Sequence, residues 1–291
     1  MPALFNRRRL LCRAATCGAS LWAGANGLAL PLQAQASQPT GRIKKAIKYK
    51  MIVEKLSVAD KFELVKDLGF EGLEVRVHGM DDRRELLRAS ESTGIAIHGI
   101  VNSSDPDLRG AIDLAHYLGA TSVLCVAGRV NEKNAYDENY RATQKLYRDA
   151  APYAEKYQVR LLVENVWNEF LLSPLEMARY LDEIGSPWVA AYFDIGNVMR
   201  FGWPEQWIRI LGKRIVKVDV KEYSRKKLAD EGLWKGLDVE LGEGDVDWAA
   251  VREALRSIDF QGWATVQSKG GDRTRLADVA ARMDRVLGLG K

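Results

Sequence analysis

Acidic and amide side chains close several short apolar segments of this chain, at positions where buried strands are expected to end. A charge placed there is costly unless it is paired or bound to a metal ion. Glu164, Asp194 and Asp219, together with Gln267, would offer only oxygen atoms as ligands. Such a set suits a hard divalent cation and favours Mn²⁺ or Mg²⁺ over Zn²⁺, which prefers nitrogen and sulfur.

Three further polar side chains, Glu74, His98 and Lys221, occupy comparable positions and are candidates for contacts with a substrate. Each has a structural alternative. A single buried acid is often half of an ion pair, and a lone histidine is as often structural. Lys221 could pair with Asp219 or Glu222 instead of binding a substrate oxyanion. The gathering of these residues, more than any one of them, indicates a small-molecule site.

Short apolar segments alternate with longer amphipathic ones from residue 44 onward. This alternation predicts eight strand–helix units, with strands at 47–53, 72–77, 95–101, 122–127, 160–165, 189–194, 215–223 and 263–268. Eight parallel strands close a (β/α)₈ barrel, an α/β fold whose sites lie at the carboxyl ends of the strands. An open doubly wound sheet is the alternative. No glycine-rich phosphate turn follows the first predicted strand, so the barrel is favoured.

The first 36 residues have the features of an export signal. Arg7-Arg8-Arg9 precedes a weakly apolar run at 14–32, and Ala34-Gln35-Ala36 offers a small-x-small cleavage site. The segment resembles a twin-arginine signal peptide, which predicts a single mature domain at 37–291 and a periplasmic or secreted location. An uncleaved membrane anchor is the alternative. Polar residues and glycines interrupt the run, which argues against a membrane span after processing.

The charge of the chain argues against a nucleic-acid partner. The formal net charge is +4, from 43 basic and 39 acidic residues. Four of the arginines, Arg7, Arg8, Arg9 and Arg13, lie in the predicted signal, which has no acidic residue. Removing them leaves 39 basic residues, equal to the number of acidic ones. The mature domain is therefore formally neutral, without the basic excess that nucleic-acid binding requires.

Four sequence motifs carry a resemblance to a known family. They are Phe70-Glu71-Gly72-Leu73-Glu74, Val163-Glu164-Asn165, Phe193-Asp194-Ile195-Gly196-Asn197 and Gly242-Glu243-Gly244-Asp245-Val246-Asp247-Trp248. In this order and spacing they resemble the sugar phosphate isomerase/epimerase family, which has the xylose-isomerase-like TIM barrel. The strand-seven lysine adds a similarity to its L-ribulose-5-phosphate 3-epimerase branch.

The resemblance implies a divalent metal held by a Glu, an Asp, a His and a Glu on strands five to eight. Glu164 and Asp194 match the first two positions. Asp219 stands where the family has the histidine, and Gln267 stands where it has the second glutamate. The resemblance therefore implies a metal site of Glu164, Asp194, Asp219 and Gln267, with two positions that depart from the family pattern.

The family reaction moves a proton at a carbon beside a carbonyl group. By resemblance, Glu164 is the catalytic base as well as a metal ligand, and Lys221 is a catalytic contact. Epimerisation needs a base on each face of the carbon, and the amide of Gln267 cannot serve as one. Glu164 alone could still support a one-base aldose–ketose shift. The resemblance as a whole predicts an isomerase or epimerase acting on a free or keto sugar.

Two alternatives stay open: a lyase that acts on 3-keto sugars, and an altered barrel that binds a sugar without turnover. The predicted export favours unphosphorylated carbohydrates as substrates. The related apurinic-endonuclease barrel needs a histidine-rich zinc site. The chain has only three histidines, which argues against that function. The oligomeric state is open.

Overall fold

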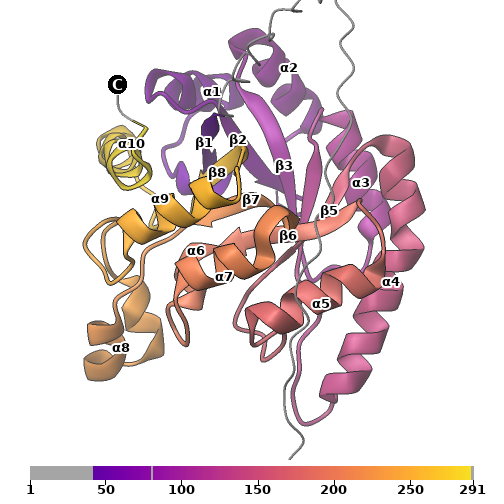
Figure 1. Ribbon diagram of the computed structural model, residues 1–291. Helices are drawn as coiled ribbons and strands as arrows, with labels where there is room; N and C mark the ends of the chain where they lie inside the picture. Colours follow the sequence, from indigo (N-terminus) through magenta and orange to yellow (C-terminus); the bar gives the residue numbers. More distant parts are fainter. Residues whose placement is uncertain (1–41, 80, 290–291) are drawn as a thin grey trace, which may run out of the picture. The chain divides into compact units, whose positions relative to one another are not determined.

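Eight parallel strands form the centre of the molecule, closed into a barrel in chain order with β8 beside β1 (Figure 1). The computed structural model describes residues 42–79 and 81–289. The fold confirms the predicted (β/α)₈ barrel and excludes the open sheet. The strands are β1 (Ile43–Lys48), β2 (Gly72–Arg76), β3 (Ala96–Ser103), β4 (Ser122–Cys125), β5 (Arg160–Glu164), β6 (Val189–Asp194), β7 (Ile215–Val220) and β8 (Gly262–Val266).

Helices surround the barrel and connect consecutive strands (Figure 1). The longer ones are α1 (Val58–Asp67), α2 (Arg83–Thr93), α3 (Leu108–Tyr117), α4 (Tyr136–Tyr157), α5 (Pro174–Ile184), α7 (Pro204–Leu211), α9 (Trp248–Ser257) and α10 (Arg273–Leu287). Short helices add to the connections: η1 (Tyr49–Met51), α6 (Ile195–Val198), η2 (Gly212–Arg214), α8 (Arg225–Glu231) and η3 (Leu233–Leu237). Ser57 and Ser173 cap α1 and α5 through their hydroxyl groups.

The first strand lies earlier in the chain than predicted. It ends at Lys48, and part of the apolar run that was expected to be strand forms the 3₁₀ turn η1. The prediction was shifted because the strand contains two lysines that lie inside the fold. Lys45 reaches Asp284 at 2.7 Å, and Lys48 is buried in the barrel mouth. Lysines are rarely buried unless paired, so this strand does not have the composition typical of one.

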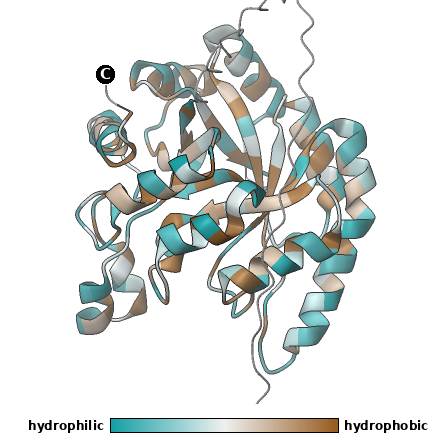
Figure 2. Cartoon of the chain, in the orientation of Figure 1, coloured by the Kyte–Doolittle hydropathy of each residue, from teal (hydrophilic) through white to brown (hydrophobic). Residues whose placement is uncertain are grey.

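The barrel has an apolar shell and a partly polar interior. The main core packs the outer faces of the strands against the helices, and apolar colour runs along strands and inner helix faces in Figure 2. Inside, Leu124, Leu162 and Ala190 form a small apolar cluster with Tyr192. The predicted signal at 1–36 lies outside the described residues. Among the described residues, no helix is both long and apolar enough to cross a membrane.

Candidate metal and sugar site

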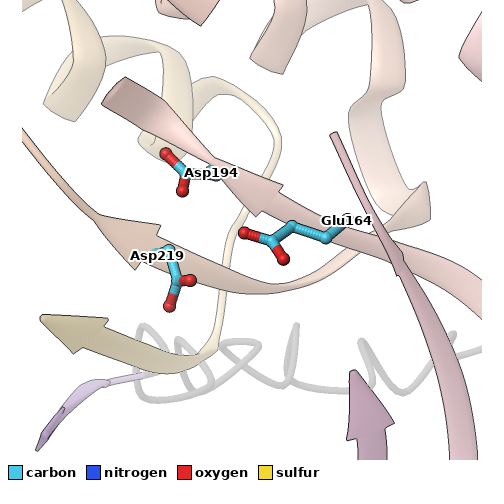
Figure 3. A group of neighbouring side chains, drawn as sticks. All are labelled: Glu164, Asp194 and Asp219. Carbon is cyan, nitrogen blue, oxygen red and sulfur yellow. The ribbon is translucent and has the colours of Figure 1, made fainter. Parts of the chain in front are cut away.

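Three acids meet at the carboxyl-terminal mouth of the barrel. Glu164 and Asp194 end β5 and β6, and Asp219 is the penultimate residue of β7. One carboxylate oxygen of each lies within 4.8 Å of the others, and all three residues are buried (Figure 3). The structure thus brings together three of the four predicted metal ligands.

Strand alternation explains why these side chains share one space. Successive side chains of a strand point to opposite faces, so residues two apart face the same way. Glu164 follows the interior residue Leu162 by two positions, and Asp194 follows Tyr192 in the same way. Parallel neighbours in register then place the acids side by side; Asp194 pairs with Asp219 across β6 and β7.

A cavity of about 80 Å³ adjoins this acid cluster. Glu164, Glu74, Lys48 and Gln267 are among the residues that line it. Gln267, the predicted fourth ligand, therefore lines the same space as Glu164. Its amide oxygen is buried and has no hydrogen-bond partner among residues 42–79 and 81–289, and the same holds for Oδ1 of Asp219. Buried oxygens without partners are unusual, and these fit a hard cation.

Two lysines neutralise part of the cluster. Lys48 Nζ lies 2.8 Å from Asp219 Oδ2 and 2.9 Å from Glu74 Oε2. Burial alone would lower the pKa of Lys48, but the carboxylates of Asp219 and Glu74 together raise it above its ordinary value. Lys48 is therefore a fixed positive charge. Its place in the site was not predicted, because the first strand was expected to continue beyond it.

Lys221 has a different partner from those weighed from sequence. Its Nζ lies 2.6 Å from Asp194 Oδ2 and donates to Asn197 Oδ1 at 3.0 Å. The contact requires Gly196, because a Cβ there would lie 2.7 Å from Lys221 Cγ. The side chain of Lys221 is 12% exposed, so the ammonium lies at the rim of the cluster. It is thus placed where a substrate oxygen could reach it.

Glu222 explains the glycine-rich motif at 242–248. Its carboxylate accepts the Gly242 N–H at 2.8 Å and the indole N–H of Trp248 at 2.7 Å. It also accepts the Val246 N–H at 3.2 Å. These bonds fix the connection between β7 and α9 beside the mouth. The motif therefore has a structural role here, and Glu222 is not part of the acid cluster.

Glu74 lines the cavity and is held from below by an interior network. Tyr192 OH donates to Glu74 Oε1 at 3.0 Å and also lies 2.9 Å from Thr265 Oγ1. Gly99 pairs with Glu74 across β2 and β3, and a Cβ at Gly99 would lie 2.6 Å from Glu74 Oε1. The glycine therefore makes room for this carboxylate inside the barrel.

His98 belongs to the same interior network, below the cavity. Its Nδ1 lies 3.1 Å from Lys217 Nζ and its Nε2 lies 3.1 Å from Thr265 Oγ1. The ring stacks on Trp263 with centroids 4.4 Å apart. Burial and then the Lys217 charge lower the pKa of His98, and burial lowers that of Lys217 to about 7. Both ring nitrogens are engaged, and the hydrogen-bonded link from His98 to Glu74 runs through Thr265 and Tyr192. His98, predicted to contact a substrate, is not among the residues that line the cavity.

Burial and mutual repulsion shift Glu164 and Asp219 toward their protonated forms. Burial, followed by the charges of Asp219 and Asp194, raises the pKa of Glu164 to about 8. Burial raises the pKa of Asp219 to about 7, with Lys48 opposing the effects of Glu74 and Asp194. A divalent cation would offset this repulsion, because metal ligands must be ionised. The residues present therefore fit a cation site of Glu164, Asp194, Asp219 and Gln267.

Known proteins with this architecture include sugar epimerases. The structure of D-allulose 3-epimerase from Methylomonas sp. superposes with a TM-score of 0.68 at 18% identity, over 84% of this chain and 97% of that one. The 3-keto-D-glucoside 4-epimerase of Escherichia coli gives a TM-score of 0.70 at 13% identity, over 84% and 99%. These likenesses show the shared barrel.

Sequence comparison extends the relation to curated proteins. An L-ribulose-5-phosphate 3-epimerase of E. coli is 26% identical over 232 residues, which cover 70% of this chain and 79% of that protein. Its name supports the prediction of an enzyme of the isomerase and epimerase class. The pattern that defines xylose isomerase-like TIM barrels matches residues 62–285. The chain therefore belongs to the xylose isomerase-like TIM barrel family.

Proposed function

We propose that this protein transfers a proton at a carbon next to the carbonyl group of a free or keto sugar, with Glu164 as the base. One observation carries the proposal. The Glu164 carboxylate is buried and lines the cavity, yet it forms no hydrogen bond or ion pair with any residue that the structure describes. Burial and the neighbouring acids raise its pKa to about 8 in the metal-free protein, and a bound cation would keep it ionised, which is the form that accepts a proton.

A divalent cation completes the proposed site. Glu164, Asp194, Asp219 and Gln267 would hold Mn²⁺ or Mg²⁺, both of which prefer oxygen ligands. When bound, the cation supplies Lewis-acid polarisation of the sugar oxygens beside the reacting carbon. Lys221 would stabilise the oxyanion that develops as the proton leaves, and Glu74 would accept hydrogen bonds from sugar hydroxyls. The resemblance of residues 1–36 to a twin-arginine signal supports a periplasmic or secreted location and hence an unphosphorylated carbohydrate.

Gln267 favours a reaction that needs one base. An aldose–ketose shift can proceed with Glu164 returning the proton to a neighbouring carbon on the same face. A lyase reaction on a keto sugar is the second candidate. It is favoured by the same observation, because elimination also begins with removal of a single proton next to the carbonyl.

The proposal is tested by solvent exchange in D₂O. The mature protein, loaded with Mn²⁺, is incubated with ketoses and 3-keto sugars, and deuterium entry is followed by NMR. Exchange that is lost with a chelator and regained with Mn²⁺ is expected. Gln267→Glu should create or raise epimer formation, since it restores a second carboxylate. A protein that binds neither Mn²⁺ nor any sugar by calorimetry would contradict both the enzyme and the binding-only alternative.

A further inference from the structure

Two unpaired positive charges line the cavity beside the acids. Lys50 lies in η1 directly after β1, and Arg76 is the last residue of β2. Neither side chain forms an ion pair or a hydrogen bond within the part of the chain that the structure describes. Lys48, in the same wall, has two carboxylate partners. The side of the mouth formed by β1 and β2 therefore carries positive charge that the protein does not neutralise.

Several other cations on the connections at this end of the barrel are paired. Arg200 and Arg129 both contact Glu169, and Arg225 donates to the carbonyl oxygens of Met199 and Gly202. Lys226 and Lys235 pair with neighbouring aspartates. The side chains of Lys55, Lys133 and Lys269, which lie on the same connections, form no ion pair or hydrogen bond with the described residues either. Lys50 and Arg76 differ from them because they line the cavity beside the acids.

The two cations are close enough to repel each other. Reduced hydration and then the charge of Arg76 lower the pKa of Lys50, with Lys48 adding to the effect. The nearest acid of the same wall, Glu74, is paired with Lys48, and Glu164 forms no ion pair with either cation. Two like charges in one cavity are unfavourable in the free protein, and an anion between them would remove that cost.

We propose that Lys50 and Arg76 bind an anionic group of the substrate, so that the sugar carries an oxyanion at the β1–β2 side while its reacting carbon lies at Glu164. Ser103 lines the same cavity and adds a hydroxyl donor. A guanidinium group binds carboxylate or phosphate through two parallel hydrogen bonds. The predicted export favours a carboxylate, as in a sugar acid, over a phosphate ester; both would bind through the same chemistry, and binding measurements distinguish them. The inference rests on the proposed function for the identity of the ligand as a sugar.

Binding of matched sugars tests this inference without turnover. Calorimetry on the Mn²⁺-loaded protein compares D-glucuronate, D-glucose 6-phosphate and D-glucose, which share a ring and differ in charge. At least one anionic sugar should bind about tenfold more tightly than D-glucose, and the tighter of the two identifies the anion. Arg76→Ala and Lys50→Ala should each weaken anionic binding about 10- to 100-fold, the range for hydrogen bonds to charged groups. Binding of D-glucose should not change.

Matched variants on nearby helices control for general loss of positive charge. Arg88→Ala on α2 and Lys66→Ala on α1 remove exposed cations away from the cavity, and should leave anionic binding unchanged. Equal affinity for charged and neutral sugars, or anionic binding that survives both cavity substitutions, would overturn the inference. Charge-dependent binding without deuterium exchange would support it while contradicting the proposed function. Deuterium exchange on neutral sugars that is unchanged in the cavity variants would support the proposed function and contradict the anion site.

Discussion

The two ends of the barrel differ in how their charges are satisfied. The amino-terminal end has larger hollows, of about 400 Å³ beside Phe260 and about 440 Å³ beside Arg214. Charged residues beside them include exposed ion pairs, as in the contact of Arg214 with Asp182 at 2.6 Å. The mouth encloses only about 80 Å³, yet its acids are buried and Glu164 has no described partner. Buried carboxylates without partners therefore identify the mouth as the candidate active site, although the hollows at the other end are larger.

Removing a carboxylate at the mouth should have the largest effect on metal binding. Asp219→Asn replaces a charged ligand by a neutral amide and deprives Lys48 of one partner. Because changes in groups that merely support ligands cost about 10- to 100-fold in affinity, we expect a loss of Mn²⁺ affinity of at least about 100-fold. Calorimetric titration measures it, with Asp182→Asn at the other end as the matched control. Unchanged affinity in Asp219→Asn would remove Asp219 from the site.

Glu164→Gln should stabilise the metal-free protein at high pH. The pKa of Glu164 is higher in the folded protein, about 8, than the usual value of about 4.5. Its contribution to stability therefore becomes more unfavourable as pH rises from about 4.5 to 8, and glutamine removes it. We expect a gain on the order of a few kcal/mol at pH 8.5 and little change at pH 5. Urea unfolding at both values measures this, and a pH-independent difference would contradict it.

Mn²⁺ affinity should rise with pH. The cation must displace protons from Glu164 and Asp219, whose pKa values are about 8 and about 7. Affinity should therefore increase about tenfold per pH unit for each proton displaced, and level off above pH 8. Titrations between pH 6 and 9 in buffers of different ionisation enthalpy would also count the protons released. Affinity that is flat over this range would show that the acids are already ionised.

Breaking the pair at the opposite end should have the smallest effect. Hydrogen bonding to Arg214 lowers the pKa of Asp182, so the stabilising contribution is present at neutral pH and is lost as pH falls through this lowered pKa. Asp182→Asn should cost no more than about 1 kcal/mol at pH 7, because the pair is largely exposed. Urea unfolding measures it. A cost as large as that of a buried pair would weaken the contrast between the two ends.

Sequence predicted the fold and most of the acid cluster, because the number of strands and the acids at strand ends are both local signals. How deep a side chain lies within the barrel is harder to predict, because it depends on the exact residue at which its strand ends. His98 is the third residue of the eight-residue strand β3, so it lies well below the end of that strand, whereas Glu164 and Asp194 are final residues. A strand rises about 3.3 Å per residue, and an end misplaced by two residues changes which side chain reaches the cavity.

Lys48 could not be found by the same reasoning. A lysine is favourable inside a barrel only if carboxylates from other strands surround it, and its partners Glu74 and Asp219 are 26 and 171 positions away in the chain. The composition of the first strand therefore gave no local signal for its position. Long-range pairing, visible only in three dimensions, determines both where β1 ends and which charge enters the site.

The central claim, that the unpartnered acid of the mouth removes a proton from a sugar, is tested most directly by the rate of deuterium entry. The rate is measured on the first sugar that exchanges, for the Mn²⁺-loaded wild type, Glu164→Gln, and the control variants Glu63→Gln and Asp182→Asn. We expect a loss of about 10²- to 10⁴-fold in Glu164→Gln, the range for a general base, and rates near wild type in both controls. Exchange at the wild-type rate in Glu164→Gln would contradict the account.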